Sequence, residues 1–104
     1  MRQGEIWWAE LPAPVGRRPL LILTRNEACL VRSSVTAALV TTTIRNIPTE
    51  VSLAVEDGMP KPCVINVDTI YTIHKDTLKT KQMTISQAKW QAVSQAIKFA
   101  FAIN

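Results

Sequence analysis

Short apolar runs separated by turn residues dominate the first three quarters of the chain. Glu5 to Leu11 is rich in aromatic and branched residues, which predicts a strand. Pro19 to Thr24 is almost continuously apolar, as in a strand covered on both faces. Val35 to Thr43 predicts a third strand, and Thr49 to Val55 alternates like a half-buried strand. Glu27 to Ser34 is ambiguous and leaves room for one short helical turn.

The next segment combines turn residues with another apolar stretch. Asp57-Gly58 supplies the positive φ of a tight turn. Pro60-Lys61-Pro62 keeps the following residues extended. Cys63 to Ile73 is dense in Val, Ile and Thr, which predicts one or two further strands. Short strands joined by Gly and Pro turns indicate an antiparallel sheet.

The hydrophobic pattern changes after His74. Ser86 to Ile103 contains no Gly or Pro and carries apolar residues at three- and four-residue spacing, which predicts a helix. Thr84 or Ser86 can cap its start, and Thr84-x-x-Gln87 fits a capping box. The core-facing stripe is expected to be Trp90, Val93, Ile97 and Phe101.

A second apolar stripe makes this helix apolar over more than half its girth. It needs a cover as well, either more core or a partner subunit. Strands followed by a helix predict the α+β class, here a small curled antiparallel barrel closed by the helix. The second stripe consists of Ala92, Ala96, Phe99 and Ile103.

The length and composition fit one globular domain that spans residues 1–104. Hydrophobic residues make up 47% of the 104 residues, enough for a real core. No apolar run is long enough to cross a bilayer, so no membrane contact is expected. The first residues lack the apolar stretch of a signal peptide, so the chain is expected in the cytoplasm.

Charge and missing motifs narrow the chemistry. Twelve Lys and Arg against eight Asp and Glu give a net charge of +4, which suits a polyanion such as nucleic acid. His74 is the only histidine, so one subunit cannot use a pair of histidines. Cys29 and Cys63 form no zinc motif, and nucleotide-binding and serine-hydrolase motifs do not occur. No metal and no cofactor are therefore expected.

Arginine and threonine remain as candidates for chemistry. A guanidinium grips a phosphate through two parallel hydrogen bonds. Arg17-Arg18 precede one buried strand and Arg25 follows it, while Thr41-Thr42-Thr43-Ile44-Arg45 closes the next strand. If the two strands are neighbours, these groups can meet at one end of the sheet. The alternative is that they are ordinary solvated strand ends.

Four segments stand out along the chain: Gly4 to Trp8, Arg17 to Arg25, Thr41 to Val51 and Glu56 to Ile70. In their order and approximate spacing they resemble the MazF/PemK toxins. The resemblance covers nearly the whole chain and implies an SH3-like, plasmid-maintenance-toxin barrel with a C-terminal helix, assembled as a homodimer. It also implies a metal-independent endoribonuclease that cleaves single-stranded RNA (mRNA) and leaves 2′,3′-cyclic phosphate and 5′-hydroxyl ends.

The resemblance also implies roles for individual residues. Arg18, the Arg before the Pro of the second strand, matches the family's catalytic arginine, and Thr41 matches its catalytic threonine, with Thr42 as a one-step alternative. The first loop, ahead of Arg17, is shorter than in many family members, and that loop commonly contributes to sequence choice. Backbone contacts are expected from Arg17, Arg25, Arg45 and Lys61. RNA base edges are expected to meet Thr43, Asn66, Asp68 and Thr69.

The family pairs with an antitoxin, MazE-like, whose acidic tail lies along the active-site groove, and the basic charge suits that partner. Two other functions stay open. A CcdB-like topoisomerase poison shares the fold, although Phe99 to Asn104 lacks that family's Trp-Gly-Ile tail. A barrel that binds RNA without cutting it is the second. Trp7 and Trp8 point to opposite faces of a strand, so one is expected in the core and the other in an interface.

Overall fold

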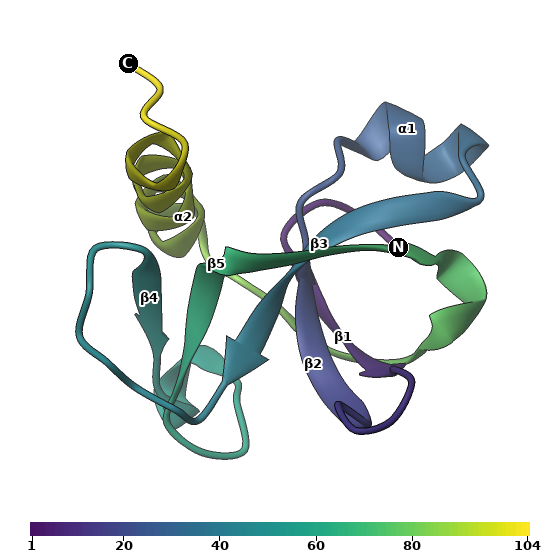
Figure 1. Cartoon of the computed structure of the whole chain (residues 1–104), viewed down its shortest axis with the longest axis horizontal. Helices are drawn as coiled ribbons and strands as arrows, with labels where there is room; N and C mark the ends of the chain where they lie inside the picture. Colours follow the sequence, from purple (N-terminus) through teal and green to yellow (C-terminus); the bar gives the residue numbers. More distant parts are fainter.

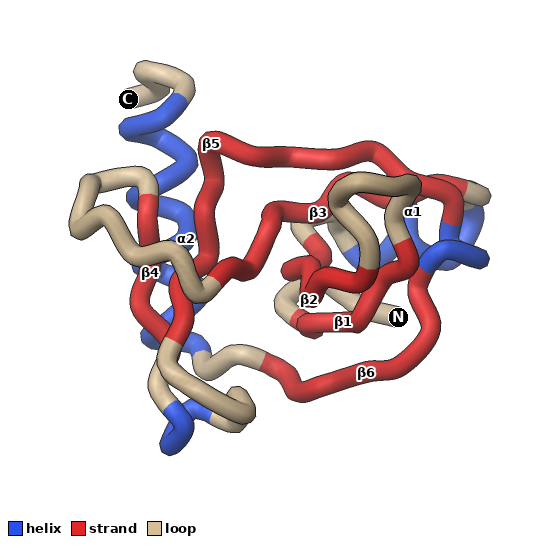
Figure 2. Tube along the Cα trace, turned by 60° about the horizontal axis from the view of Figure 1, so that its bottom comes forward, coloured by secondary structure: helices blue, strands red, loops and turns tan.

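Six antiparallel strands form one curled sheet in the computed structural model, which describes all 104 residues (Figure 1). The strand order across the sheet is β4-β5-β3-β2-β1-β6. Figure 2 shows how the outer strands curve toward each other, so that the sheet makes a half-barrel. The strands are β1 (Glu5–Glu10), β2 (Arg17–Ile22), β3 (Ser34–Thr41), β4 (Glu50–Leu53), β5 (Cys63–His74) and β6 (Leu78–Thr84).

Two α-helices and two short 3₁₀ turns complete the chain. The C-terminal helix packs against β4 and β5, and the short helix lies at the other side of the molecule (Figure 1). No helix is long and apolar enough to cross a membrane. The elements are α1 (Asn26–Val31), α2 (Gln87–Ala100), η1 (Val55–Asp57) and η2 (Lys75–Thr77).

The predicted strands are confirmed to within one or two residues at most ends. The ambiguous 27–34 segment does contain one short helix, α1. The 63–73 segment lies in one strand of twelve residues, Cys63–His74, which is bulged where the partner of β3 jumps from Asn66 to Ile70. Asp57-Gly58 closes a 3₁₀ turn, with Gly58 at φ 113°. The SH3-like antiparallel sheet with a C-terminal helix is therefore the fold that the sequence indicates.

The sequence pattern missed one strand ahead of the final helix, and one of the two caps that it offered for that helix does not form. Strand β6 was not predicted, because its sequence LKTKQMT is mostly polar and only Leu78 is buried. Such a strand is typical of a sheet edge, where polar side chains discourage further pairing. Thr84 belongs to this strand, so the Thr84-x-x-Gln87 capping box does not form. Ser86 is the cap instead, and its hydroxyl accepts a hydrogen bond from the Lys89 amide at 3.1 Å.

The core is divided into two clusters, one on each side of β2. Leu21 belongs to the cluster under α2, whereas Leu20 and Ile22 belong to the cluster inside the other half of the curl. Successive side chains of a strand point to opposite faces, so a strand between two cores must be apolar on both. This confirms the interpretation of the continuous apolar run at 19–24.

Helix α2 covers the first cluster with only part of its apolar surface. Val93 and Ala96 are buried, and Trp90 and Ile97 pack against the same cluster. Phe101 is 57% exposed, contrary to the prediction, because the helix ends at Ala100. Of the second stripe, Ala96 is core, whereas Ala92, Phe99 and Ile103 are exposed.

Glu5 ties the N-terminus and β6 to β1. Its carboxylate accepts hydrogen bonds from the Trp7 indole and the Arg2 amide, both at 2.9 Å, and lies 3.1 Å from the Lys81 ammonium. Burial raises the pKa of Glu5, but these hydrogen bonds and the Lys81 charge outweigh it, so the pKa lies below its ordinary value of 4.5.

This lowered pKa makes folding stability depend on pH. The folded state holds the Glu5 proton less tightly than the unfolded state, so the stabilisation is complete above the ordinary pKa of 4.5 and is lost as pH falls through the lower folded value. Glu5→Gln is expected to lower the free energy of unfolding by about 1 kcal/mol at pH 7, with a smaller difference in acid. Urea unfolding at several pH values measures this. Glu10→Gln, at the exposed end of the same strand, is the control, and an equal loss there contradicts the assignment.

Candidate functional site

A pocket opens where β2 begins and β3 ends. The loop after η1 forms its opposite wall, and β1 contributes one tryptophan. Its volume is about 390 Å³, within the range of small-ligand pockets. The lining residues are Trp8, Arg17, Arg18, Pro19, Val40, Thr41, Thr42, Thr43, Met59, Pro60, Lys61 and Cys63.

The register of β2 and β3 explains why Arg18 and Thr41 share this pocket. The pairing of β2 with β3 begins at Leu20, opposite Leu39, so Arg18 lies two residues before it and Thr41 two residues after it, at the same end of the two strands, and both line the pocket. Side chains that stand opposite each other on neighbouring antiparallel strands lie on the same face of the sheet. The sequence-based expectation that these two groups meet at one strand end is thus met in space.

Both groups have hydrogen-bonding capacity left for a ligand. Thr41 Oγ1 accepts from the Thr43 amide at 3.2 Å, which leaves the hydroxyl proton free to be donated. Arg18 uses Nη1 to donate to the Arg17 carbonyl at 3.0 Å, and its other guanidinium protons form no hydrogen bond within the chain. Arg18 is exposed and Thr41 is half-buried, so a ligand can reach both.

The pocket is cationic. Arg17, Arg18 and Lys61 line it, and no Asp or Glu does. None of the three forms an ion pair within the chain. Three uncompensated cations with adjacent hydroxyls favour a phosphate group as the ligand.

Trp8 forms a wall of this pocket, and the sequence analysis did not assign it there. The Arg17 guanidinium carbon lies 4.1 Å from the centroid of the Trp8 ring, and the indole N–H donates to Gln82 Oε1 at 2.9 Å. Trp7 on the other face of the strand packs into the second core cluster, as one of the pair was expected to do. The Trp-Trp pattern alone cannot tell which face of the strand meets a pocket.

Arg25 does not join this strand end, and that expectation is wrong. It follows β2, whereas Arg17 and Arg18 begin it, and six extended residues separate the ends by roughly 20 Å. Arg25 lines a second pocket together with Arg32, Thr24 and Thr36.

The candidates from β5 and the 45–49 loop do not line the first pocket either. Asn66 is buried, and its side-chain oxygen accepts from the Asp68 amide at 2.9 Å. Asp68 accepts from the Thr49 hydroxyl at 2.6 Å. Arg45 is exposed, and its amide donates to Glu50 at 2.9 Å. Arg45 belongs to the loop between β3 and β4, whereas Asn66, Asp68 and Thr69 belong to β5.

Cys63 lies in the pocket as a neutral thiol. Burial raises the pKa of Cys63, and the nearby Asp57 charge raises it further. A thiol held protonated is a poor nucleophile, so covalent cysteine catalysis does not fit. No group of three or more His, Cys, Asp or Glu residues anywhere in the chain can hold a metal ion. Phosphate binding through Arg18, Thr41 and the neighbouring cations is the chemistry this pocket supports.

Comparisons with known proteins agree on one family. The family described as PemK-like, MazF-like toxin of type II toxin–antitoxin systems matches residues 2–101. A probable endoribonuclease MazF2 of Mycobacterium tuberculosis is 33% identical over 99 residues, covering 94% of this chain and 95% of the relative. Endoribonuclease MazF3 of the same organism is also 33% identical, over 84% of each chain.

Solved structures agree with this. Mycobacterium tuberculosis toxin MazF-mt6 superposes with a TM-score of 0.89 at 32% identity, over 96% of this chain and 98% of that one. An endoribonuclease in complex with its cognate antitoxin, from Mycobacterial species, gives a TM-score of 0.90 at 27% identity, over 100% and 97%. The MazE-MazF structure from Deinococcus radiodurans, at 19% identity, shares the fold, with a TM-score of 0.81 over 100% and 97%.

Proposed function

The chain belongs to the family of PemK-like, MazF-like toxins of type II toxin–antitoxin systems, and on that premise we propose that it is an endoribonuclease that cleaves single-stranded RNA, mRNA above all, without a metal. One observation carries the proposal. Arg18 and Thr41 line the same cationic pocket, with no carboxylate among its lining residues. Because mRNA is the proposed substrate, we propose that the protein acts in the cytoplasm. We also propose that residues 1–104 act as one domain.

The substrate supplies the nucleophile in this proposal. The 2′-hydroxyl gives up its proton to water as its oxygen attacks the adjacent phosphorus. The bond to the 5′-oxygen breaks, and that oxygen takes up a proton from water and leaves as a 5′-hydroxyl. The other product end is a 2′,3′-cyclic phosphate. Arg18 stabilises the charge that develops on the phosphorane oxygens, and Thr41 donates a hydrogen bond to a non-bridging oxygen.

The neighbouring residues hold the rest of the RNA. Arg17 and Lys61 are proposed to contact backbone phosphates next to the scissile one, because they line the same pocket. Thr42 and Thr43 line it too, where they can donate to phosphate or base. We propose that RNA nucleotides beyond the pocket contact Arg45, Asn66, Asp68 and Thr69. Arg25 lies at the opposite end of β2, so its proposed RNA contact requires a longer substrate.

An antitoxin is the proposed protein partner. A structural relative was solved in complex with its cognate antitoxin. Here the net charge of +4 and the cationic pocket favour an acidic, MazE-like segment that covers Arg18 and competes with RNA.

The topoisomerase-poison alternative is not favoured. The matching family is that of the PemK-like, MazF-like toxins, and the similar proteins are MazF proteins. The barrel that binds RNA without cutting it differs in one measurable outcome, intact RNA.

Incubation of the purified protein with a long single-stranded RNA in EDTA tests the function. Cleavage products with cyclic phosphate and 5′-hydroxyl ends are expected, identified by end-specific ligation and sequencing of the cut sites. Intact RNA, or cleavage that requires an added divalent ion, contradicts the proposal. Gyrase inhibition without RNA cleavage supports the rejected alternative instead.

We propose that a second copy of the chain covers the exposed apolar end of α2. Phe99 is 62% exposed, and Phe101 and Ile103 are 57% and 56% exposed, which is unusual for large apolar residues this close together. Phe99→Glu is expected to convert the dimer into a monomer, because a buried unpaired charge opposes association. Light scattering coupled to gel filtration measures the mass against 11.6 kDa per chain.

Leu30→Glu is the matched control for this dimer face. Leu30 is 81% exposed on α1, far from α2 in Figure 1. The variant is expected to remain dimeric. A monomer from Leu30→Glu and a dimer from Phe99→Glu place the interface on α1 and contradict the proposed face.

A further inference from the structure

Strand β6 carries a β-bulge beside the pocket, and Gln82 is the extra residue. Ile6 pairs with Met83 and Trp7 pairs with Lys81, so Gln82 has no partner residue across the strand pair. Bulges of this kind re-aim one side chain and are enriched next to functional sites. The groups that the Gln82 side chain contacts are therefore relevant to the pocket.

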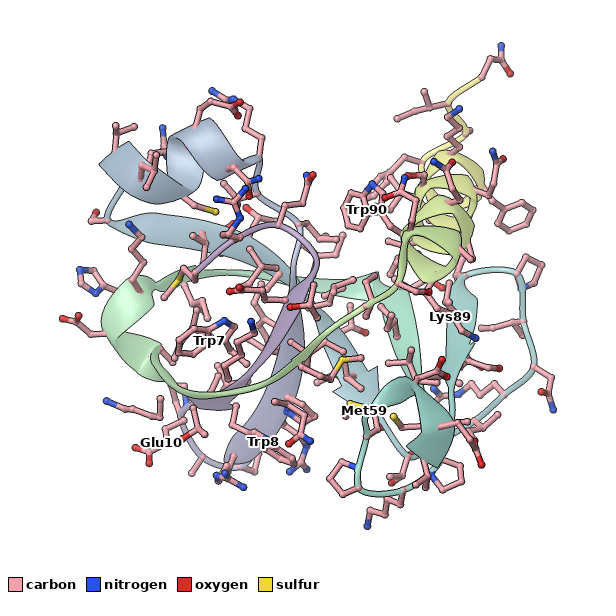
Figure 3. The ribbon with its side chains drawn as sticks, turned by 180° about the vertical axis from the view of Figure 1, so that it is seen from behind. Trp7, Trp8, Glu10, Met59, Lys89 and Trp90 are labelled. Atoms are coloured by element: carbon pink, nitrogen blue, oxygen red, sulfur yellow. The ribbon has the colours of Figure 1, made fainter.

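Gln82 connects the two walls of the pocket. Its Oε1 accepts the Trp8 indole N–H at 2.9 Å, and its Nε2 donates to the Gly58 carbonyl at 3.0 Å. Trp8 belongs to the β1 wall, whereas Gly58 directly precedes Met59 and Pro60 of the opposite wall. Figure 3 shows Trp8 and Met59 approaching the same region from separate elements. One amide thus fixes the tryptophan ring and the loop facing it.

The face of the Trp8 ring is covered by the side chain of Arg17. The Arg17 guanidinium lies over it at 4.1 Å. The Arg17 side chain forms no hydrogen bond or ion pair, so this contact alone holds it. Because the indole N–H is already paired with Gln82, the ring offers a ligand its π face and no hydrogen bond.

We propose that Trp8 is the stacking wall for a nucleobase next to the scissile phosphate, and that Gln82 is the positioning residue that orients it. The base displaces the Arg17 guanidinium from the face of the Trp8 ring, and Arg17 is then free to contact a phosphate. This inference rests on the proposed function, because it takes Arg18 and Thr41 as the place where the phosphate lodges.

Relative strength favours this exchange. An exposed cation–π contact is worth about a two- to fivefold difference in an equilibrium constant. A base stacked on an aromatic side chain is worth about five- to a hundredfold. The displaced guanidinium gains a charged partner when it binds a phosphate. The state with a base on the Trp8 ring is therefore favoured over the state with Arg17 on it.

Uncleavable DNA oligomers test the stacking wall. The probes are an octamer of deoxyadenosine, an octamer of thymidine, and an abasic octamer with the same phosphates. Tryptophan fluorescence of the wild type is expected to be quenched by a base-bearing octamer and not by the abasic one. Trp8→Phe is expected to abolish this quenching, whereas Trp7→Phe retains it. Quenching that survives in Trp8→Phe overturns the proposal.

Affinities give a second readout. Trp8→Leu is expected to weaken binding of the base-bearing octamer by about five- to a hundredfold and to leave the abasic octamer within twofold. An equal loss for both probes means a structural role only and overturns the proposal. RNA cleavage by the wild type keeps the two claims separate. If the wild type cleaves RNA and Trp8→Leu binds the octamers as tightly as the wild type does, only the stacking proposal is refuted. If stacking is observed and the wild type does not cleave RNA, only the proposed nuclease function is refuted.

The positioning role of Gln82 has its own variants. Gln82→Ala is expected to lower the preference for base-bearing over abasic octamer by about fivefold, because the ring is no longer held. Gln82→Glu keeps an acceptor for the indole N–H and is expected to restore most of that preference. Gln91→Ala, an exposed glutamine on α2, is the matched control and is expected to change nothing. An unchanged preference in Gln82→Ala overturns the positioning role.

Discussion

Arg18→Ala is expected to lower the rate of RNA cleavage by about 10³- to 10⁵-fold, the range for an arginine that stabilises charge on a transferred phosphoryl group. The phosphorane carries more negative charge than the phosphodiester, so the guanidinium contributes more to the transition state than to binding. Single-turnover cleavage of a labelled RNA measures the rate, and binding of a 2′-O-methyl oligonucleotide measures affinity.

The Arg18 experiment has two informative companions. Arg18→Lys keeps the charge but loses the two-pronged donor, so its rate is expected between those of the wild type and the alanine variant. Arg32→Ala removes the same charge from an exposed position that does not line the pocket, and full activity is expected. If Arg18→Ala weakens binding and leaves single-turnover cleavage unchanged, Arg18 only attracts RNA.

Thr41→Val is the second change with a large expected effect, a loss of about 10²- to 10³-fold in cleavage rate, as for removal of one oxyanion donor. Valine keeps the shape of the side chain on β3, so the half-buried position stays filled and only the hydroxyl is lost. The same single-turnover assay applies, with thermal unfolding to confirm the fold.

Thr84→Val is the matched control for Thr41. Thr84 is exposed on β6, outside the pocket, and its variant is expected to cleave at the wild-type rate. If Thr42→Val loses activity and Thr41→Val does not, the catalytic hydroxyl lies one residue further along, where the sequence left an alternative open.

The strands that bury apolar residues were predictable, whereas β6 was not. Strand β2 is apolar on both faces because Leu20 and Leu21 enter different core clusters, and this requirement is visible in the sequence. Strand β6 buries little beyond Leu78 and is held by backbone pairing to β1. Backbone pairing leaves no mark in a hydrophobic pattern, so polar edge strands escape prediction.

The pocket was predictable where it depends on strand ends and not where it depends on strand faces. Neighbouring antiparallel strands bring the start of β2 to the end of β3, which places Arg18 near Thr41. The same geometry excludes Arg25 from this pocket, because Arg25 follows the end of β2 and Arg18 lies at its start. Trp8 lines the pocket from one face of β1, and Gln82 is the extra residue of the bulge in β6; no local sequence signal reveals that face or that bulge.

The most direct test of the central claim uses an oligonucleotide that is DNA except for one ribonucleotide at the mapped cleavage position. The wild type in EDTA is expected to cut it only after that ribonucleotide, to leave a 2′,3′-cyclic phosphate there, and to leave the all-DNA oligonucleotide intact. Arg18→Ala is expected to leave both intact. Cleavage of the all-DNA strand, or of a strand whose only 2′-hydroxyl lies elsewhere, contradicts attack by the substrate's own hydroxyl at the Arg18–Thr41 pocket.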